Sequence, residues 1–274
     1  MSENNIITIV LDAMGGDHGI EPNVEGALIA ANSNPVKILI VGDEDKLKRS
    51  LHDKSYPSGS IKIIHAPDYI RMNESPRDAL ERKPEASINI AVRLLKEEKA
   101  DALVSAGSTG TIVLAAAKFL SRIRGVNRTA IATVYPTLNE FNKNDHLAIM
   151  LDVGANVRCG AEELAQFAIM GTAYVKEVRD EEYPSVALLN IGEESTKGGK
   201  EMKTAYQYLN KMSNLNFYGN IEGRDILRGV VDVIVTEGFV GNIVIKTMEG
   251  TATTFKQLTK MAFKAKFVWK LGLF

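Results

Sequence analysis

The stretch Leu11-Asp12-Ala13-Met14-Gly15-Gly16-Asp17-His18-Gly19 decides which fold we predict for this chain. It follows an apolar run, residues 6–11, that is typical of a buried strand, and it precedes residues 21–31, whose pattern indicates a helix. Two adjacent glycines therefore stand where a strand passes into a helix. Glycine permits a positive φ and the close approach of a ligand. Because the N–H groups of such a turn lie beside the N-terminus of the next helix, the stretch predicts an anion-binding site.

The composition is that of an ordinary globular protein and excludes several classes of function. Of the 274 residues, 45% are hydrophobic and 24% are charged, and the length suffices for one large domain or two. The net charge of −1 argues against general binding of nucleic acid. A single cysteine, Cys159, excludes an internal disulfide and fits a reducing cytosol. The sequence shows neither a signal peptide nor an apolar run long enough to span a membrane.

Apolar, β-branched runs alternate with stretches of helical spacing along the chain. This alternation indicates an α/β protein with a mainly parallel sheet covered by helices on both faces. We assign residues 1–250 to one α/β catalytic domain, with a subdivision possible near residues 135–150, and residues 251–274 to a basic amphipathic helix. The predicted strands are residues 6–11, 37–41, 61–65, 102–105, 130–134, 147–151, 186–190 and 231–236.

Five polar loops that contain glycine each follow a predicted strand. They are residues 12–18, 105–110, 152–156, 190–200 and 236–242. In a parallel α/β sheet the ligand lies beyond the carboxyl ends of the strands, so we expect the five loops to converge on one crevice. A single glycine pair would indicate only a tight turn, but five such loops favour a ligand that carries phosphate or several carbonyl groups.

At these loops the chain resembles the phosphate acyltransferase family known as PlsX, whose members make acyl phosphates for bacterial phospholipid synthesis. The N-terminal signature of that family is similar to Asp12-Ala13-Met14-Gly15-Gly16-Asp17-His18. The similarity runs in family order from residue 6 to about residue 250. The further matching segments are Ser105–Gly110, Leu151–Val157, Gln166–Gly171, Leu188–Glu194 with Lys197-Gly198, Gly219–Asp225 and Gly238–Asn242.

The resemblance implies a fold, a reaction and partners. The fold is a three-layer α/β/α arrangement with a mainly parallel sheet, like that of isocitrate and isopropylmalate dehydrogenases and of phosphotransacetylases, usually as a homodimer. The reaction converts acyl-[acyl carrier protein] and inorganic phosphate into acyl phosphate and free carrier protein. The location is the cytoplasm, with peripheral attachment to the inner face of the membrane.

The sequence departs from the family pattern at a few positions. Ser108 and Gly199 each stand where the family usually has asparagine, and Glu237 stands where it usually has aspartate. Family members also continue well past residue 274. The resemblance therefore leads us to expect a C-terminally shortened member.

The implied reaction needs a cradle for phosphate and for an oxyanion, because phosphate itself attacks the thioester carbonyl. We expect Lys197 to be the cation beside phosphate and His18 to orient phosphate or protonate the leaving sulfur. Asp12 would orient His18 or accept from backbone N–H groups, and Asn156 would donate its amide to a substrate oxygen. The predicted substrate- and phosphate-binding residues are Gly15, Gly16, Asp17, Gly107, Ser108, Thr109, Gly110, Gly241 and Asn242. Each polar residue also has a structural interpretation as a turn former, a helix cap or a solvated surface group.

No cofactor and no metal site is predicted. His52, His65 and His146 show no metal-ligand spacing with one another. Cys159 has no histidine nearby in the sequence and is interpreted as a small residue near a helix start rather than as a nucleophile.

The last residues of the sequence are strongly basic. Residues 251–274 contain five lysines and no acidic residue, whereas the remainder is mildly acidic. A basic amphipathic helix with aromatic residues suits an anionic membrane surface, and it also suits an acidic carrier protein. An ordinary packed helix with a solvated lysine face is the alternative. The predicted membrane-contact residues are Phe255, Lys256, Lys260, Phe263, Lys264, Phe267 and Trp269.

Three other functions compete with the acyltransferase. A phosphotransacetylase acting on acyl-coenzyme A shares the fold but is disfavoured by the series of motifs. A dehydrogenase is disfavoured because the sequence lacks Gly-x-Gly-x-x-Gly with an acidic residue at the expected distance. A shortened, non-catalytic homologue would bind membrane, carrier protein or a full-length partner without turnover.

Overall fold

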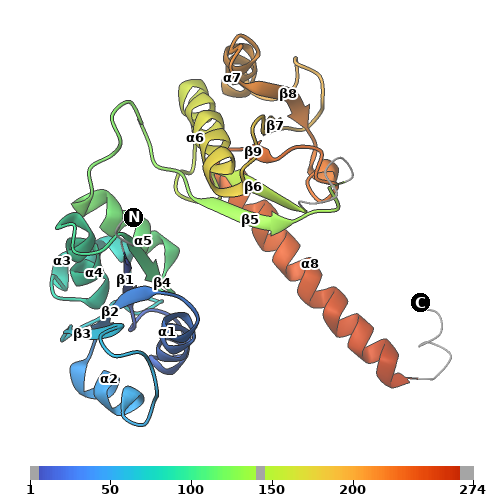
Figure 1. The fold of residues 1–274 in the computed structure, drawn as a ribbon. Helices are drawn as coiled ribbons and strands as arrows, with labels where there is room; N and C mark the ends of the chain where they lie inside the picture. The colour runs from blue at the N-terminus through green and yellow to red at the C-terminus, as the bar shows by residue number, and fades with distance from the viewer. Residues whose placement is uncertain (1–5, 140–145, 266–274) are drawn as a thin grey trace. The chain divides into compact units, whose positions relative to one another are not determined.

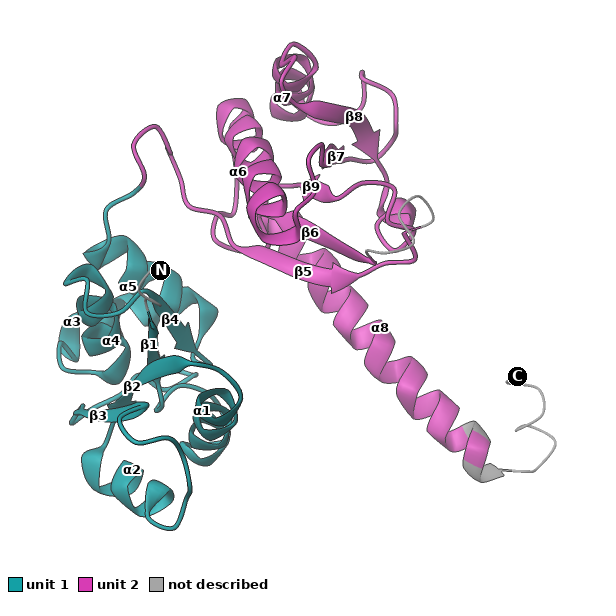
Figure 2. Ribbon diagram, viewed as in Figure 1, with its two compact units in different colours: residues 1–122 teal, residues 123–274 magenta. Residues whose placement is uncertain are grey.

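The computed structural model describes residues 6–139 and 146–265, which fold into two compact units. Unit 1 comprises residues 1–122 and unit 2 comprises residues 123–274 (Figure 1, Figure 2). The boundary therefore precedes the stretch 135–150, where the sequence suggested a subdivision. Within the described part, no cluster of buried apolar side chains contains residues of both units, so each unit has a core of its own.

Unit 1 contains a four-stranded parallel sheet with the strand order β3-β2-β1-β4. Its strands are β1 (Ile7–Asp12), β2 (Val36–Gly42), β3 (Ile61–His65) and β4 (Ala102–Ser105). Leu11 of β1 is level with Ile40 of β2 and with Val104 of β4. Because β1 is central, the loop after it lies between the loops that follow its two neighbours.

Helices cover both faces of this sheet. They are α1 (Glu21–Ser33), α2 (Glu44–Leu51), α3 (Pro76–Arg82), α4 (Ser87–Lys96) and α5 (Thr109–Phe119). On one face Leu11 and Ile40 pack with Val24 of α1 and Leu47 of α2. On the other face the alternate residues of the same strands, including Val10, pack with α4. The period of two in a strand thus supplies both faces of the sheet with apolar side chains.

Unit 2 contains a five-stranded sheet with the order β5-β6-β9-β7-β8. Its strands are β5 (Ala132–Pro136), β6 (Leu147–Leu151), β7 (Ser185–Leu189), β8 (Asn216–Ile221) and β9 (Val233–Val235). All neighbouring pairs are parallel except β5 with β6, which are antiparallel. The parallel strands β6, β9 and β7 consequently end at the same edge of the sheet.

The helices of unit 2 also lie on both faces of its sheet. They are α6 (Ala161–Arg179), α7 (Lys200–Asn210), the short 3-10 helix η1 (Gly223–Asp225) and α8 (Gly238–Ala265). Phe167 of α6 and Leu209 of α7 belong to the core on one face, with Leu188 of β7. Val240, Val244 and Met248 of α8 pack against the core of the other face. The predicted three-layer α/β/α fold with mainly parallel sheets is confirmed.

Candidate active site

The loops after β1 and β4 meet at one corner of unit 1. The buried carboxylate of Asp12 accepts a hydrogen bond from Ser105 Oγ at 2.8 Å and one from the Met14 backbone N–H at 3.2 Å. A Cβ atom at Gly15 would lie 2.7 Å from the Gly107 nitrogen and 2.9 Å from Asp12 Oδ2, so only glycine fits there. We call Asp12, Gly15, Ser105 and Gly107 the glycine corner. It brings together the two segments of unit 1 that the sequence predicted to bind phosphate.

Several backbone N–H groups at the glycine corner have no acceptor in the described part of the protein. Among residues 6–139 and 146–265, the N–H groups of Gly15 and Gly16 find no acceptor, and neither do those of Thr109 and Gly110 in the first turn of α5. The N–H of Gly107, a predicted donor to substrate, instead donates to Ser105 Oγ at 3.1 Å. The free donors therefore come from the turn after β1 and from the start of α5, which is the arrangement that binds anions.

The predicted residues Asp17 and His18 lie on the same turn with exposed side chains. Gly16 has a φ of +104°, a conformation that permits the turn to fold back toward β4. The turn is held by Asn23 of α1, whose amide donates to the carbonyl oxygens of Ala13 and Gly15, each at 3.0 Å. Asn23 was not predicted from the sequence. It lies in the first turn of α1, seven residues after Gly16.

A second cluster of loops forms in unit 2, after β6 and β9. Asp152 is fully buried, and its carboxylate accepts from the backbone N–H groups of Gly154, Ala155 and Asn156 at 2.8–3.1 Å. A Cβ atom at Gly238 would lie 2.7 Å from Asp152 Oδ2, and one at Gly241 would contact the Asp152 carbonyl oxygen. The loop after β6 therefore packs directly against the first turn of α8. We call these residues the Asp152 cluster.

Asn156 has a supporting position in this cluster. Its side-chain amide donates to the Thr129 carbonyl oxygen and to Asp152 Oδ2, both at 2.8 Å, so both of its amide hydrogens have protein acceptors. Neither amide hydrogen of Asn156 is therefore free for the predicted donation to a substrate oxygen. The predicted residue Asn242 lies one turn into α8, where its side-chain oxygen and Cβ would each be 3.7 Å from a Cβ atom placed at Gly154.

The loop that carries Lys197 is held by hydrogen bonds from a residue of β8 and from the residue directly after β7. Asn190 donates to the Lys197 carbonyl oxygen at 3.2 Å, and Asn220 of β8 donates to the Glu194 carbonyl oxygen at 2.9 Å. The Lys197 ammonium group is exposed and lies 3.9 Å from the Glu194 carboxylate. In the described residues this loop makes no hydrogen bond or ion pair with the Asp152 cluster. The structure thus groups four of the five loops into two pairs, one in each unit, and a single shared crevice stays a prediction.

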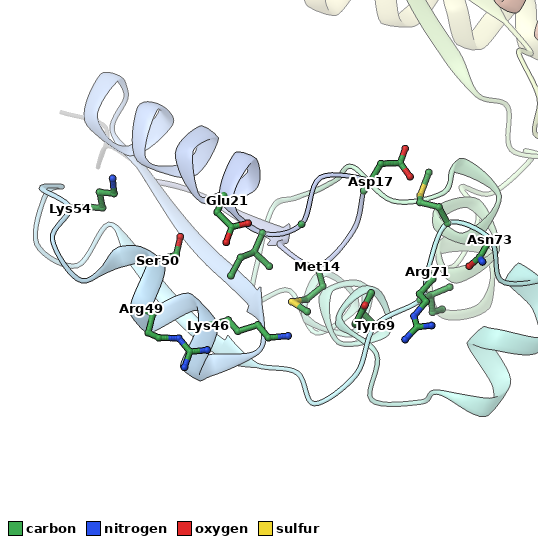
Figure 3. A pocket seen from close by; sticks show the side chains of 15 residues that line it. Met14, Asp17, Glu21, Lys46, Arg49, Ser50, Lys54, Tyr69, Arg71 and Asn73 are labelled. Carbon is green, nitrogen blue, oxygen red and sulfur yellow. The ribbon is translucent and has the colours of Figure 1, made fainter.

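A cavity of about 930 Å³ opens beside the glycine corner in unit 1 (Figure 3). It lies at the carboxyl ends of β1, β2 and β3, and it shares Gly16 and Asp17 with the turn after β1. Its cationic side chains are Lys46, Arg49, Lys54 and Arg71. We call this the basic cavity. None of these four cations was predicted from the sequence.

Cys159 is buried directly before α6, as the sequence interpretation expected. Burial is the largest influence on its thiol and raises its pKa to about 11, while a backbone hydrogen bond from Gly238 opposes the shift. A thiol with this pKa is protonated at neutral pH and is a poor nucleophile.

The basic segment predicted to contact a membrane begins within α8. Phe255, Lys256, Lys260 and Phe263 lie in the helix and are exposed. Lys264 is also in the helix, whereas Phe267 and Trp269 lie outside the described residues. Among the helices that the structure describes, none combines the length and the apolar character that crossing a membrane would require.

Solved structures with the same fold include two phosphotransacetylases and a dehydrogenase. A phosphotransacetylase from Streptococcus pyogenes superposes with a TM-score of 0.64 at 18% identity, over 91% of this chain and 83% of that one. The EutD phosphotransacetylase from Staphylococcus aureus gives 0.61 at 19% identity, over 92% and 84%. A 4-hydroxythreonine-4-phosphate dehydrogenase from Burkholderia phymatum gives 0.50 at 16% identity, over 89% and 84%. The described elements and these likenesses together define the class of the protein as a three-layer α/β/α fold.

Sequence comparison identifies the family within this class. Residues 7–274 match the family model described as fatty acid synthesis protein. A phosphate acyltransferase from Dictyoglomus turgidum is 43% identical over 265 residues, which is 97% of this chain and 77% of the relative. One from Thermodesulfovibrio yellowstonii is 45% identical over 267 residues, 97% of this chain and 75% of the relative. The chain belongs to the phosphate acyltransferase family of lipid synthesis, and the family assignment made from its motifs is confirmed.

Proposed function

We propose that the chain transfers the acyl group of an acyl-[acyl carrier protein] to inorganic phosphate, yielding acyl phosphate and free carrier protein for phospholipid synthesis. The observation that carries the proposal is the set of free N–H groups around Gly15, Gly16 and the first turn of α5. A small oxyanion is the ligand that such donors bind best. The matching family and the similarity to phosphate acyltransferases support the reaction class.

The chemistry follows from what these donors hold. A phosphate oxygen attacks the thioester carbonyl carbon, the C–S bond breaks, and the sulfur leaves as a thiolate that takes up a proton. Phosphate is already an anion near neutral pH, so the protein needs no serine or cysteine nucleophile. Its task is to position phosphate and to stabilise the oxyanion that forms on the acyl carbon, where one well-placed donor contributes about 3–4 kcal/mol.

The side chains receive roles according to their places. His18 is exposed on the turn after β1, where it can protonate the departing sulfur. Asp12 holds Ser105 and the Met14 N–H and so fixes the turn that donates to phosphate. Lys197, on the exposed loop of unit 2, is the proposed cation that accompanies phosphate. Asn156 supports the loop after β6, since both of its amide hydrogens are engaged.

We also propose the partners and the location that the family resemblance implies. The chain acts as a homodimer in the cytoplasm, attached to the inner face of the membrane by the basic part of α8. Exposed apolar side chains beside exposed lysines in that part of α8 support the attachment, because anionic lipid surfaces attract such helices.

The reaction is tested by supplying long-chain acyl-[acyl carrier protein] with and without inorganic phosphate. We expect free carrier protein to appear only with phosphate, and acyl phosphate to be trapped by hydroxylamine. Turnover of acyl-coenzyme A in preference to the carrier-bound thioester would instead identify a phosphotransacetylase. Binding without any turnover would identify a non-catalytic homologue.

The place of the reaction is tested at Gly15. Gly15→Ala puts a methyl group against the Gly107 nitrogen and the Asp12 carboxylate, so we expect kcat/KM for phosphate to fall about 100-fold. Gly26→Ala is the matched control, because Gly26 lies in α1 with no atom within 4 Å of the added Cβ. An unchanged kcat/KM in correctly folded Gly15→Ala would remove the glycine corner from the site.

A further inference from the structure

The basic cavity carries more positive charge than its own structure uses. Four cationic side chains line it, against two acidic ones, Asp17 and Glu21. In the described residues Arg49 and Lys54 form no ion pair. In the same described part the guanidinium group of Arg71 forms none either, whereas Lys46 pairs with Asp43 at 3.6 Å. These cations come from two stretches of the chain, α2 with the residues directly after it and the segment after β3, and the fold brings the two stretches together.

The side chains in this cavity are arranged for an elongated anion. Figure 3 shows Lys46 and Arg49 projecting from α2, with Tyr69 and Arg71 across from them on the segment after β3. The remaining wall is mixed, with the polar residues Ser50 and Asn73 and an apolar part that includes Met14, Ile70 and Met72. A ligand with a charged group at one end and a chain behind it would therefore meet cations and an apolar surface at once.

The size of the cavity suits a small ligand. A volume of about 930 Å³ lies in the range of pockets for small molecules and cofactors. Its four cations favour a slender, phosphate-bearing group as the occupant.

The neighbouring glycine corner restricts which slender anion fits. Gly16 and Asp17 belong both to the cavity wall and to the turn whose N–H groups would hold inorganic phosphate. A molecule in the cavity therefore reaches the reacting centre if it carries the thioester at its far end. The acyl group of a carrier protein is attached in this way, as a thioester at the end of a tether that joins the protein through a phosphodiester.

We propose that the basic cavity of unit 1 binds the phosphodiester of the phosphopantetheine tether of the acyl donor, with Lys46, Arg49 and Arg71 as its cationic contacts. The identity of the ligand rests on the proposed function, whereas the preference for a phosphate-bearing chain rests on the cavity alone. The apolar wall formed by Met14 and Met72 contacts the tether, and the thioester lies beside the turn at Gly16.

The test compares two donors that differ only in this phosphate, acyl-4′-phosphopantetheine and acyl-pantetheine with the same acyl chain. We expect the protein to prefer the phosphorylated donor. Arg49→Gln and Arg71→Gln should each lower kcat/KM for that donor about tenfold, as expected for loss of one charge-assisted contact. They should leave kcat/KM for acyl-pantetheine and the KM for inorganic phosphate unchanged. Lys48→Gln is the matched control, because Lys48 lies on α2 but pairs with Glu44 outside the cavity.

Three results would overturn the proposal. An equal loss with both donors would show that the cations do not recognise the phosphate of the tether. A raised KM for inorganic phosphate would assign the cavity to free phosphate. If Arg49→Gln or Arg71→Gln bound carrier protein without its tether more weakly than the unmodified chain does, the cavity rim would be a docking surface for the folded carrier protein.

Binding measured without turnover separates this proposal from the proposed function. Calorimetry with 4′-phosphopantetheine and with pantetheine should show a preference for the phosphorylated molecule that Arg49→Gln abolishes. If that preference is present and no acyl phosphate forms from any donor, the proposed function fails and the cavity assignment stands. If acyl phosphate forms and the preference is absent, the cavity assignment fails alone.

Discussion

Two buried aspartates perform the same task at the ends of strands. Asp12 ties the turn after β1 to Ser105 after β4, and Asp152 gathers the backbone N–H groups of its own loop. In each case a carboxylate replaces water as the acceptor for polar groups that the fold has buried, and an unsatisfied donor there would cost about 1–3 kcal/mol. The sequence marks both positions as a strand-end aspartate followed by glycine, but it does not show which loop each one binds.

Asp12→Asn tests the positioning role at the glycine corner. The amide has one acceptor oxygen instead of two, so one of the hydrogen bonds from Ser105 and Met14 is lost and the turn shifts. We expect the stability to fall by about 1–2 kcal/mol and kcat/KM for phosphate to fall by at least about tenfold. Urea unfolding and steady-state kinetics measure the two effects. The control is Asp101→Asn. Asp101 lies at the amino-terminal end of the same sheet beside Thr8, so this variant should keep kcat/KM for phosphate unchanged.

Cys159 predicts how the protein responds to alkaline pH. Burial raises the pKa of its thiol to about 11 from an ordinary value of 9.0. Between these values the unfolded chain loses the thiol proton and the folded chain keeps it, so the free energy of unfolding decreases as pH rises from about 9 to 11.

Alkaline urea titrations provide the measurement. The part of the stability loss that is due to the thiol should be absent from Cys159→Ala, and the native thiol should react with a disulfide reagent at neutral pH far more slowly than the unfolded one. An equally steep loss in Cys159→Ala would assign the alkaline sensitivity to other groups.

Eight of the nine strands in the described residues were predicted from the sequence, because each is a short apolar run that needs no partner to be recognised. Strand β8 was missed, because its sequence Asn-Phe-Tyr-Gly-Asn-Ile contains only one β-branched residue. The antiparallel pairing of β5 with β6 and the order of β6, β9 and β7 were not predicted, since pairing depends on residues far apart in the chain. The basic cavity was missed for the same reason. Lys46 and Arg71 belong to different elements, and only the strand order β3-β2-β1 brings them to one recess. The rule applied to β1 and β4, that loops at carboxyl ends converge, would have found it if extended to β2 and β3.

Helix α8 makes a prediction at the scale of one element. Phe255 is 66% exposed, Leu258 54% and Met261 66%, on a helix that also exposes Lys256 and Lys260. Reversing both lysines to glutamate should weaken binding to vesicles of anionic lipid by at least about tenfold, because each basic residue near such a surface contributes about 1 kcal/mol.

The control for this experiment lies on the same helix. Lys246 pairs with Glu249 at 2.8 Å, so Lys246→Glu changes the charge of α8 without touching its exposed aromatic part. We expect this variant to bind anionic vesicles nearly as well as the unmodified chain. Equal binding of all three proteins would exclude α8 as the membrane contact.

At the scale of the whole molecule, each of the two units has a core of its own, whereas the sequence suggested one domain with a possible subdivision near residues 135–150. No composition shift marks the boundary at residues 122 and 123, because the connecting residues are neither rich in glycine and serine nor low in complexity. The separation is visible only in the clusters of buried side chains. Three of these clusters lie within unit 1 and two within unit 2.

Independent cores predict independent folding. A fragment of residues 1–122 should form a monomer with native-like circular dichroism and one cooperative urea transition, because its sheet has helices on both faces. A broad, non-cooperative transition of the fragment would show that unit 1 requires unit 2 for its stability.

The turn at Gly16 and Asp17 is one piece of backbone with two neighbours, the glycine corner and the basic cavity. Two ligands that share such a wall are thermodynamically linked. Whatever factor the tether applies to the affinity for phosphate, phosphate applies to the affinity for the tether. A substitution in this common segment is therefore expected to change both affinities together.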